Sequence, residues 1–394
     1  MKMKNKKILI RGTWLESYNV GDNAIIEGLK SSLKGRGELK AITGSVERVK
    51  KWLGIDAVKV VSSRNPFLFL KIFAEVKNSK AFLLTGGTPI YNDATQMCIN
   101  FIISSICKFY RVPVFVFGVS YRECQSRIVR WLVIGIFRNC EKIYFREYGS
   151  IAEVKHNYGN VVRGKIDFLP DPATQIDYDI LVPQVSVDAS SNISLTEAPY
   201  VVVCPRDFSA DKSFSNHHYN QEFDSDRYLK LLALCIKQLL ENTNYNIVFL
   251  PMNVQSPDDD TVISSYLYDL YKENFKHRMT VIKAQLHPAS VIKIFRDASF
   301  SITVRFHAGV LSCSNGTPMI SLAYDKKNID ISEVLEMKDF TFDIKNTSEI
   351  DLVDAISTME DNISKLSKKC VENNMKLRKI FRTIIQHHFS VGEK

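Results

Sequence analysis

The strongest constraint on the fold is the presence of two series of short apolar runs. Within each series the runs alternate with segments of helical periodicity, and one polar segment separates the two series. The first series begins with an expected buried strand at Lys7–Arg11, followed by a glycine-containing loop and a helix. Asp22 is expected to cap that helix. Strands that alternate with helices favour parallel sheets covered on both faces. The sequence therefore predicts an α/β fold.

Each series supplies its own strands and helices. The expected strands lie at 7–11, 57–61, 81–84, 114–117, 142–145, 200–204, 245–250, 279–282, 299–304 and 318–323, with helices at 125–137, 227–241, 260–272, 289–296, 308–313 and 350–388. One hydrophobic core rarely grows beyond roughly 250–300 residues, so this chain of 394 residues is expected to form more than one domain.

The predicted domain boundaries follow the polar segment, where Asp, Ser, Pro and Asn cluster. We expect an N-terminal Rossmann-like domain at 1–175, a linker at 176–198 and a C-terminal Rossmann-like domain at 199–370. A basic helix at 371–394 is expected to pack back on the first domain. Two parallel-sheet domains of this kind would face each other across a cleft.

Charge is distributed unevenly along the chain. The net charge is +9, yet residues 1–150 contain 25 Lys and Arg against 11 Asp and Glu, so the remainder is mildly acidic. A basic front half suggests an anionic partner, and membrane headgroups, an acidic substrate and nucleic acid all fit. Nucleic acid is disfavoured because no zinc-finger, homeodomain or ribonucleoprotein signature occurs.

The sequence also predicts a cytoplasmic location, with association at the inner membrane face left open. Only Ile8, Leu9 and Ile10 follow the basic start before Arg11, whereas a signal peptide needs an apolar run of roughly 7–15 residues. No apolar run is long enough for a transmembrane helix. The eight cysteines include no C-x-x-C pair and are expected to be reduced and buried.

Polar residues just after the expected strands are the candidate site residues, because open α/β sheets bind ligands at the carboxyl ends of their strands. They are Gly21, Asp22, Gly86, Gly87, Arg146, Arg206, Arg305, His307 and Lys327. Arg305 and His307 alternate along an extended segment that leads into a helix, so both can point toward an anion near its N-terminus. The alternative is a capping arginine, a hydrogen-bonded core histidine and a surface Arg206 paired with Asp207.

Other chemistries lack their sequence signals. Neither G-x-G-x-x-G, G-x-x-x-x-G-K-[ST] nor G-x-S-x-G is present, which disfavours dinucleotide binding, P-loop hydrolysis and a serine-hydrolase elbow. Asp258, Asp259 and Asp260 resemble a metal cluster, but consecutive carboxylates do not face one point. We expect Asp260 or Ser256 to cap the next helix, and we predict no metal site.

Several segments, in order along most of the chain, resemble the polysaccharide pyruvyl transferase family. They are Tyr18-Asn19-Val20-Gly21-Asp22-Asn23-Ala24-Ile25, Leu84-Thr85-Gly86-Gly87, Val116-Phe117-Gly118-Val119-Ser120, Tyr144-Phe145-Arg146-Glu147, Asp171-Pro172-Ala173, Arg305-x-His307, Gly316-Thr317-Pro318 and Ala323-Tyr324-Asp325-Lys326-Lys327. Two positions depart from the family pattern. Thr88 replaces the third glycine of G-G-G, and Lys326 replaces a proline.

The resemblance implies a glycosyltransferase-B-like fold and the transfer of enolpyruvyl from phosphoenolpyruvate to a sugar of a capsule or exopolysaccharide, giving a pyruvate ketal. In that role Arg305 and His307 are catalytic, and Arg206, Arg305, Lys327 and Arg146 bind phosphoenolpyruvate. Asn19, Gly21, Asp22, Gly86 and Gly87 belong to loops on the acceptor side. Phosphoenolpyruvate is the donor substrate, and no metal or cofactor is expected.

Two other functions stay open at the level of the sequence. A nucleotide-sugar-dependent glycosyltransferase would use the same cations to hold a diphosphate. A non-catalytic capsule-assembly subunit would only bind. The acceptor sugar, its linkage to a lipid and the oligomeric state are not encoded in any motif.

Overall fold

The chain divides into two compact units in a computed structural model. Its described residues are 7–12, 15–59, 67–178, 198–208, 224–256 and 258–390, with only the backbone described for 67–69. Unit 1 comprises Met1–Ser17, Asp22–Ile176 and Arg378–Lys394, and unit 2 comprises Tyr18–Gly21 and Asp177–Leu377. Residues 179–197 of the expected linker and 391–394 of the expected basic helix lie outside the described residues.

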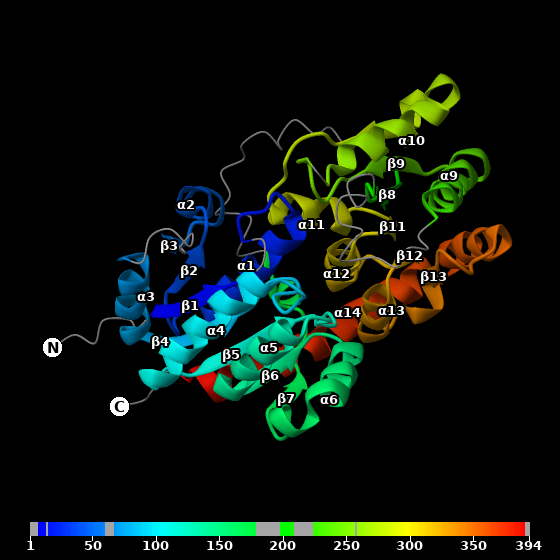
Figure 1. Cartoon of the computed structure of the whole chain (residues 1–394). Helices are drawn as coiled ribbons and strands as arrows, with labels where there is room; N and C mark the ends of the chain where they lie inside the picture. The colour runs from blue at the N-terminus through cyan, green and yellow to red at the C-terminus, as the bar shows by residue number, and fades with distance from the viewer. Residues whose placement is uncertain are drawn as a thin grey trace. The chain divides into compact units, whose positions relative to one another are not determined.

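Unit 1 contains a parallel sheet whose strand order is β3-β2-β1-β4-β5-β6-β7 (Figure 1). The strands are β1 (Lys7–Arg11), β2 (Leu39–Thr43), β3 (Asp56–Lys59), β4 (Ser79–Leu84), β5 (Val114–Val119), β6 (Lys142–Phe145) and β7 (Ile166–Phe168). Sequence analysis did not predict β2 or β7. Lys40 and Asp167 interrupt their apolar runs, which therefore lack the continuous hydrophobicity of the central strands.

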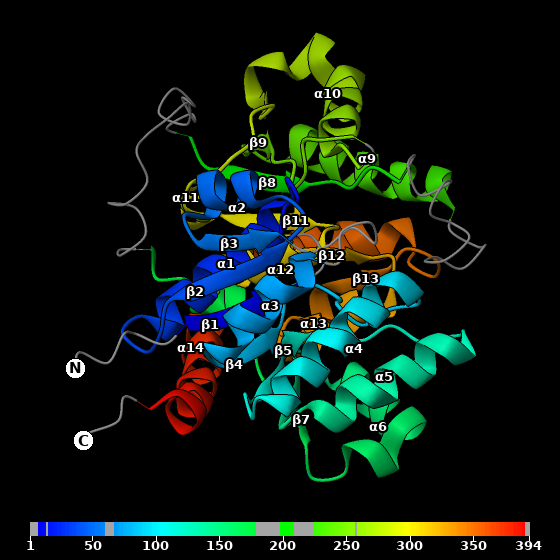
Figure 2. The same cartoon turned by 60° about the vertical axis from the view of Figure 1, so that its left-hand side comes forward.

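Helices cover both faces of this sheet (Figures 1 and 2). They are α1 (Val20–Leu33), α2 (Val46–Leu53), α3 (Phe67–Lys77), α4 (Ala94–Phe109), α5 (Arg127–Asn139), α6 (Tyr148–Val162) and the end of α14 (Glu349–Phe389). Inward side chains of α3 to α6 share one core with Val114 and Val116 of β5. Because strand side chains alternate, Phe115 and Phe117 point to the opposite face, where Phe389 and Phe381 of α14 pack against them.

Helix α1 begins at Val20, so the expectation that Asp22 caps it is wrong. Asp22 lies in the first turn of the helix, where its carboxylate accepts a hydrogen bond from Ser17 Oγ at 2.9 Å. A carboxylate in the first turn still stabilises the helix through its dipole.

Unit 2 contains a second parallel sheet, with strand order β10-β9-β8-β11-β12-β13. Its strands are β8 (Tyr200–Cys204), β9 (Asn246–Phe249), β10 (Met279–Val281), β11 (Phe300–Thr303), β12 (Met319–Ala323) and β13 (Thr341–Asp343), and its helices are α9 (Ser225–Asn242), α10 (Asp260–Phe275), α11 (Pro288–Arg296), α12 (Phe306–Ser314), α13 (Lys326–Val334) and the first part of α14. The edge strand β13 was not predicted. The prediction of two parallel-sheet α/β domains is confirmed.

Both sheets have the doubly wound strand order in which successive strands first proceed toward one edge and then toward the other. The order reverses between β1 and β4 in unit 1 and between β8 and β11 in unit 2. Ligands of such folds bind beyond the carboxyl ends of the strands at this switch point. Arg206 follows β8, Arg305 follows β11, and His307 lies in the first turn of α12, so all three are at the end of the sheet where a ligand is expected.

All eight cysteines are free thiols, and seven of them are buried, as expected for core residues. Among the helices that the structure describes, none has the length and apolar character needed to cross a bilayer.

Candidate functional site

Arg305 stands at the start of α12, where its side chain binds two aspartates. It is the N-cap residue of the helix, yet its side chain makes no capping hydrogen bond. Nε and Nη2 donate to the two carboxylate oxygens of Asp260 at 3.0 and 2.6 Å, and Nη1 donates to Asp258 Oδ2 at 2.7 Å. The fork of the guanidinium matches the Asp260 carboxylate, which makes this ion pair specific in geometry.

Asp260 joins the loops that follow three neighbouring strands. It is fully buried, and besides Arg305, after β11, it accepts hydrogen bonds from the backbone N–H groups of Asp207, after β8, and of Met252 and Asn253, after β9. Burial raises the pKa of Asp260, and the charge of Arg305 opposes that shift. Asp260 therefore fixes the edge of the sheet where the candidate site residues lie.

The sequence-based expectation for the aspartate run is wrong. Asp259, rather than Asp260 or Ser256, caps α10 by accepting the N–H of Thr261 at 2.9 Å. Asp258 and Asp260 instead bind Arg305. Burial disfavours the charged guanidinium, but the two carboxylates outweigh it and raise the pKa of Arg305.

Arg206 is held between aromatic rings and a carboxylate. The centre of its guanidinium lies 4.8 Å from the ring centroids of both Phe208 and Tyr324, within the range of cation–π attraction. Its Nε lies 3.9 Å from Asp258 Oδ1. The side chain is buried, so the alternative of a surface arginine is wrong. Asp258 therefore contacts both arginines of the predicted site.

The backbone at Arg206 is also fixed. Tyr228 of α9 is almost fully buried, and its hydroxyl accepts the N–H of Arg206 at 2.9 Å and donates to the Arg206 carbonyl at 3.1 Å. Burial raises the pKa of the Tyr228 phenol, which therefore keeps the proton that it donates. Sequence analysis did not identify Tyr228, because its role depends on its position over the loop.

His307 lies against Gly21, in the first turn of α1, nearly 290 residues earlier in the sequence. A Cβ on Gly21 would lie 2.3 Å from His307 Nδ1, so only glycine fits there. Asn19 Oδ1 accepts the N–H of Gly21 at 2.8 Å, and the N–H of Val20 binds the Met252 carbonyl at 2.8 Å. The structure thus brings Asn19 and Gly21 together with His307 in unit 2.

Lys327 follows β12, in the first turn of α13. Its Nζ lies 3.3 Å from Asp325 Oδ2, and Asp325 caps the helix by accepting the Lys327 N–H at 2.7 Å. The next residue, Asn328, donates to the Val304 carbonyl at 2.9 Å and so supports the residue before Arg305. The structure gives Lys327 a neighbouring carboxylate, and its contact with a substrate stays a prediction.

The other candidate residues belong to unit 1. Gly86 and Gly87 follow β4 and have φ values of +82° and +54°, which side chains rarely adopt. A Cβ on Gly87 would lie 3.4 Å from Asp22 Oδ1, so these two predicted loop residues are neighbours. Their contact with an acceptor stays a prediction.

Arg146 joins three loops of unit 1. It is 2% exposed and follows β6. Its Nη1 donates to Asp171, after β7, at 2.6 Å, and its Nε donates to the hydroxyl of Ser120, after β5, at 2.8 Å. This arrangement supports a structural role, and the predicted contact with phosphoenolpyruvate stays a prediction.

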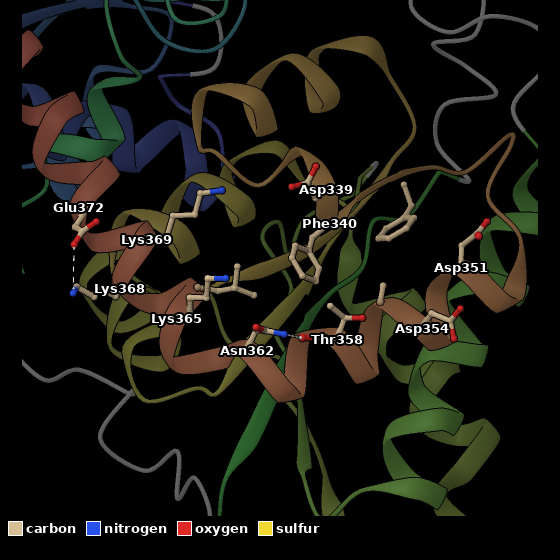
Figure 3. Close-up of a pocket in the computed structure, with 13 residues that line it drawn as sticks. Asp339, Phe340, Asp351, Asp354, Thr358, Asn362, Lys365, Lys368, Lys369 and Glu372 are labelled. Carbon is tan, nitrogen blue, oxygen red and sulfur yellow. Dashed lines mark hydrogen bonds and ion pairs between the residues drawn. The ribbon is translucent and has the colours of Figure 1, made fainter.

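A separate hollow of unit 2 lies between α14 and the segment that contains β13 (Figure 3). It has a volume of about 930 Å³. It is lined by Asp339, Phe340, Phe342, Asp351, Asp354, Ala355, Thr358, Asn362, Lys365, Leu366, Lys368, Lys369 and Glu372. The predicted site residues do not line it, and it therefore adds nothing to the Arg305 site.

Comparison with known proteins fits this arrangement. The sequence model of one family, described as polysaccharide pyruvyl transferase, matches residues 19–326 and so spans every candidate residue except Lys327. The chain belongs to the polysaccharide pyruvyl transferase family. The family resemblance drawn from the motifs is thereby confirmed.

Solved structures share the fold of this pyruvyl transferase family member at low sequence identity. A glycosyltransferase from Rickettsia africae has a TM-score of 0.61 and 10% identity over 99% of this chain and 100% of its own. A UDP-GlcNAc 2-epimerase from Methanocaldococcus jannaschii has a TM-score of 0.59 and 12% identity over 96% and 99%. The Anabaena protein Alr3699/HepE, in complex with UDP and glucose, has a TM-score of 0.58 and 10% identity over 98% and 100%. These likenesses support a fold of the glycosyltransferase-B class.

Proposed function

We propose that this protein transfers the enolpyruvyl group of phosphoenolpyruvate to two hydroxyls of a saccharide, forming a cyclic pyruvate ketal in a capsule or exopolysaccharide. The observation that carries the proposal is the grouping of Arg206, Arg305 and His307 at the switch point of the unit 2 sheet. Two guanidinium groups suit a donor that carries both a carboxylate and a phosphate.

In the proposed reaction His307, as an imidazolium, protonates the methylene carbon of phosphoenolpyruvate and converts it to a methyl group. A sugar hydroxyl bonds to the neighbouring carbon, the carbon–oxygen bond to phosphate breaks, and a second hydroxyl closes the ketal. One of the two hydroxyl protons replaces the proton that His307 gave, and the other leaves with phosphate. The arginines supply the positive charge, and the proposal includes no metal or cofactor.

The contacts of Arg305 refine its proposed role. Asp260 is fully buried and bound by three backbone N–H groups, so it is a permanent partner of Arg305. Asp258 is 29% exposed and lies beside both arginines. We infer that the anionic group of the donor replaces the Asp258 carboxylate beside Arg206 and Arg305, because a partly exposed carboxylate returns to water at less cost than a buried one.

The remaining candidates take the roles implied by the family. Lys327 and Arg146 are proposed to balance phosphate charge, and Asn19, Gly21, Asp22, Gly86 and Gly87 to belong to the acceptor loops. We further propose that the acceptor is lipid-linked and is used at the cytoplasmic face of a membrane, where the basic front half would favour anionic headgroups.

The test is incubation of the purified protein with phosphoenolpyruvate and a panel of galactoside and mannosaminide acceptors, followed by mass spectrometry. A mass gain matching pyruvate, with release of one phosphate per product, supports the proposal. A hexose gain from a nucleotide sugar would show the glycosyltransferase alternative instead. Binding of phosphoenolpyruvate with no product from any acceptor would favour a non-catalytic subunit.

A further inference from the structure

The outer surface of α3, α4 and α5 in unit 1 exposes large apolar side chains. Leu70, Phe73, Phe109, Ile128 and Trp131 are between 38% and 76% exposed. Single exposed apolar residues are common on protein surfaces, but a group of this size on neighbouring helices indicates a surface that binds a membrane or another protein. The three helices lie side by side on one face of the sheet (Figure 2).

Ring contacts connect these exposed residues across the helices. Trp131 of α5 packs against Phe101 of α4, with ring centroids 5.4 Å apart. Tyr110, directly after α4, contacts Phe73 of α3 at 6.3 Å and Phe109 at 5.1 Å. Ring contacts therefore join Trp131 to α4 and Phe73 to Phe109, and the packing of α4 against both α3 and α5 places the two groups on neighbouring helices.

Positive charge surrounds the same residues. Residues 67–139 contain nine Lys and Arg but only three Asp and Glu. Each acidic residue already has a partner: Glu75 pairs with Lys40, Asp93 caps α4, and Glu123 pairs with Arg130. The basic side chains Lys71, Lys108, Arg111, Arg127 and Arg138 are exposed and lie on or next to the same three helices.

We propose that this α3–α5 surface, made of those five apolar and five basic residues, binds a bilayer that contains anionic phospholipid. Tryptophan and phenylalanine insert at the headgroup level, and lysine and arginine bind the anionic headgroups beside them. A second copy of the chain is a poorer occupant, because a two-fold contact would bring these like charges face to face.

The inference extends the proposed use of a lipid-linked acceptor at a membrane, and it is measured without catalysis. The full chain is sedimented with vesicles of equal parts phosphatidylglycerol and phosphatidylcholine, and with vesicles of phosphatidylcholine alone. We expect the chain to bind the anionic vesicles, and to bind them more weakly as the salt concentration rises. The Debye screening length falls from about 10 Å at 0.1 M salt to about 3 Å at 1 M.

The double variant Phe109→Ser/Trp131→Ser is expected to bind anionic vesicles about tenfold or more weakly, since both side chains are lost from the interface. The matched control is Val262→Ser/Tyr266→Ser, which removes two exposed apolar side chains from α10 of unit 2 and is expected to bind like the wild type. Circular dichroism of both variants checks that they are folded, as expected for exposed positions.

The inference is overturned if the wild type does not bind anionic vesicles at low salt, or if both double variants bind equally well. It is also overturned if Phe109→Ser/Trp131→Ser abolishes a dimer in sedimentation velocity while vesicle binding is unchanged. Transfer to a water-soluble acceptor is assayed separately, so vesicle binding without any transfer would count against the proposed function alone.

Discussion

Units 1 and 2 have corresponding strand orders, with one more strand at the edge of unit 1. In each unit a buried charged side chain joins the loops after three neighbouring strands. In unit 1 the central group is a cation, Arg146, which binds Ser120 and Asp171. In unit 2 it is an anion, Asp260, which binds Arg305 and three backbone N–H groups. One topology therefore supports central groups of opposite charge.

The two arrangements differ in whether a partner of the buried charged group is exposed enough to be replaced by a ligand. In unit 1 the partners of Arg146 are as deeply buried as Arg146 itself. In unit 2 the partly exposed Asp258 binds Arg305 together with Asp260 and also lies near Arg206. In the proposed function, unit 2 therefore offers two arginines to the donor while Asp260 keeps the loops in place.

Two buried arginines, one in each unit, differ in the charge of their partners. Arg11, after β1, donates to the neutral amides of Asn100 and Gln96 at 2.7 Å each, and burial lowers its pKa to about 10 although Glu16 and Tyr91 oppose that shift. Arg305 has two carboxylates instead, and its pKa is raised. Neutral partners satisfy the hydrogen bonds of an arginine, but only carboxylates compensate its charge.

Replacement of His307 is expected to have the largest effect on activity. In His307→Ala, ketal formation should fall about 10²–10⁴-fold because the proposed general acid is lost. Calorimetry should still detect phosphoenolpyruvate binding, because the arginines remain. His156→Ala, at an exposed position of α6 in unit 1, is the control and should leave activity unchanged. Full activity in His307→Ala would show that the acid is another group.

The two central ion pairs can be compared by removing one carboxylate from each. Asp260→Asn and Asp171→Asn should each lower the free energy of unfolding by about 3–5 kcal/mol, since each removes the closest buried counter-charge of a buried arginine. Thermal unfolding followed by calorimetry measures both. If only one variant is destabilised, the two groups are not equivalent supports of their sheets.

Asp258→Asn separates the exchangeable carboxylate from the permanent one. We expect tighter binding of phosphoenolpyruvate by about fivefold, because the internal competitor for Arg206 and Arg305 loses its charge, with about 1 kcal/mol or less lost in stability. Isothermal titration with phosphoenolpyruvate measures the dissociation constant. Weaker binding would mean that Asp258 orients the arginines for the donor.

The smallest effect concerns pH and the end of α14 in unit 1. His388 Nε2 lies 2.8 Å from Tyr144 Oη, and burial, helped by His387 and Lys142, lowers the pKa of His388. A group with a lowered pKa stabilises the fold above its unfolded value of about 6.5, and the stability is lost as pH falls toward the native value. We expect a loss below about 1 kcal/mol, because His388 is only partly buried.

The measurement is the thermal midpoint at about pH 8 and about pH 5.5 for the wild type and for His388→Gln. The thermal midpoint of the wild type should fall more between about pH 8 and about pH 5.5 than that of His388→Gln, because glutamine does not titrate in this range. Equal losses in the two proteins would show that the pH response comes from other groups.

The sequence by itself determined the fold class, and it predicted the positions of the candidate site residues along the chain. Continuous apolar runs such as 200–204 predicted the central strands, because strands buried on both faces have no polar positions. The edge strands β7 and β13 and the outer strand β2 escaped prediction, because short or interrupted apolar runs resemble loops. Arg206, Arg305 and His307 were predicted from their places after strands.

Only the tertiary structure decided which groups these residues meet. Asp260 lies 45 residues from Arg305 along the chain and reads as a helix cap in a run of three aspartates. Gly21 reads as a loop residue until His307 fills the space where its side chain would lie. Local patterns specify secondary structure, whereas the pairing of charges depends on the folding of separate loops onto one sheet edge, where burial makes an unpaired charge costly.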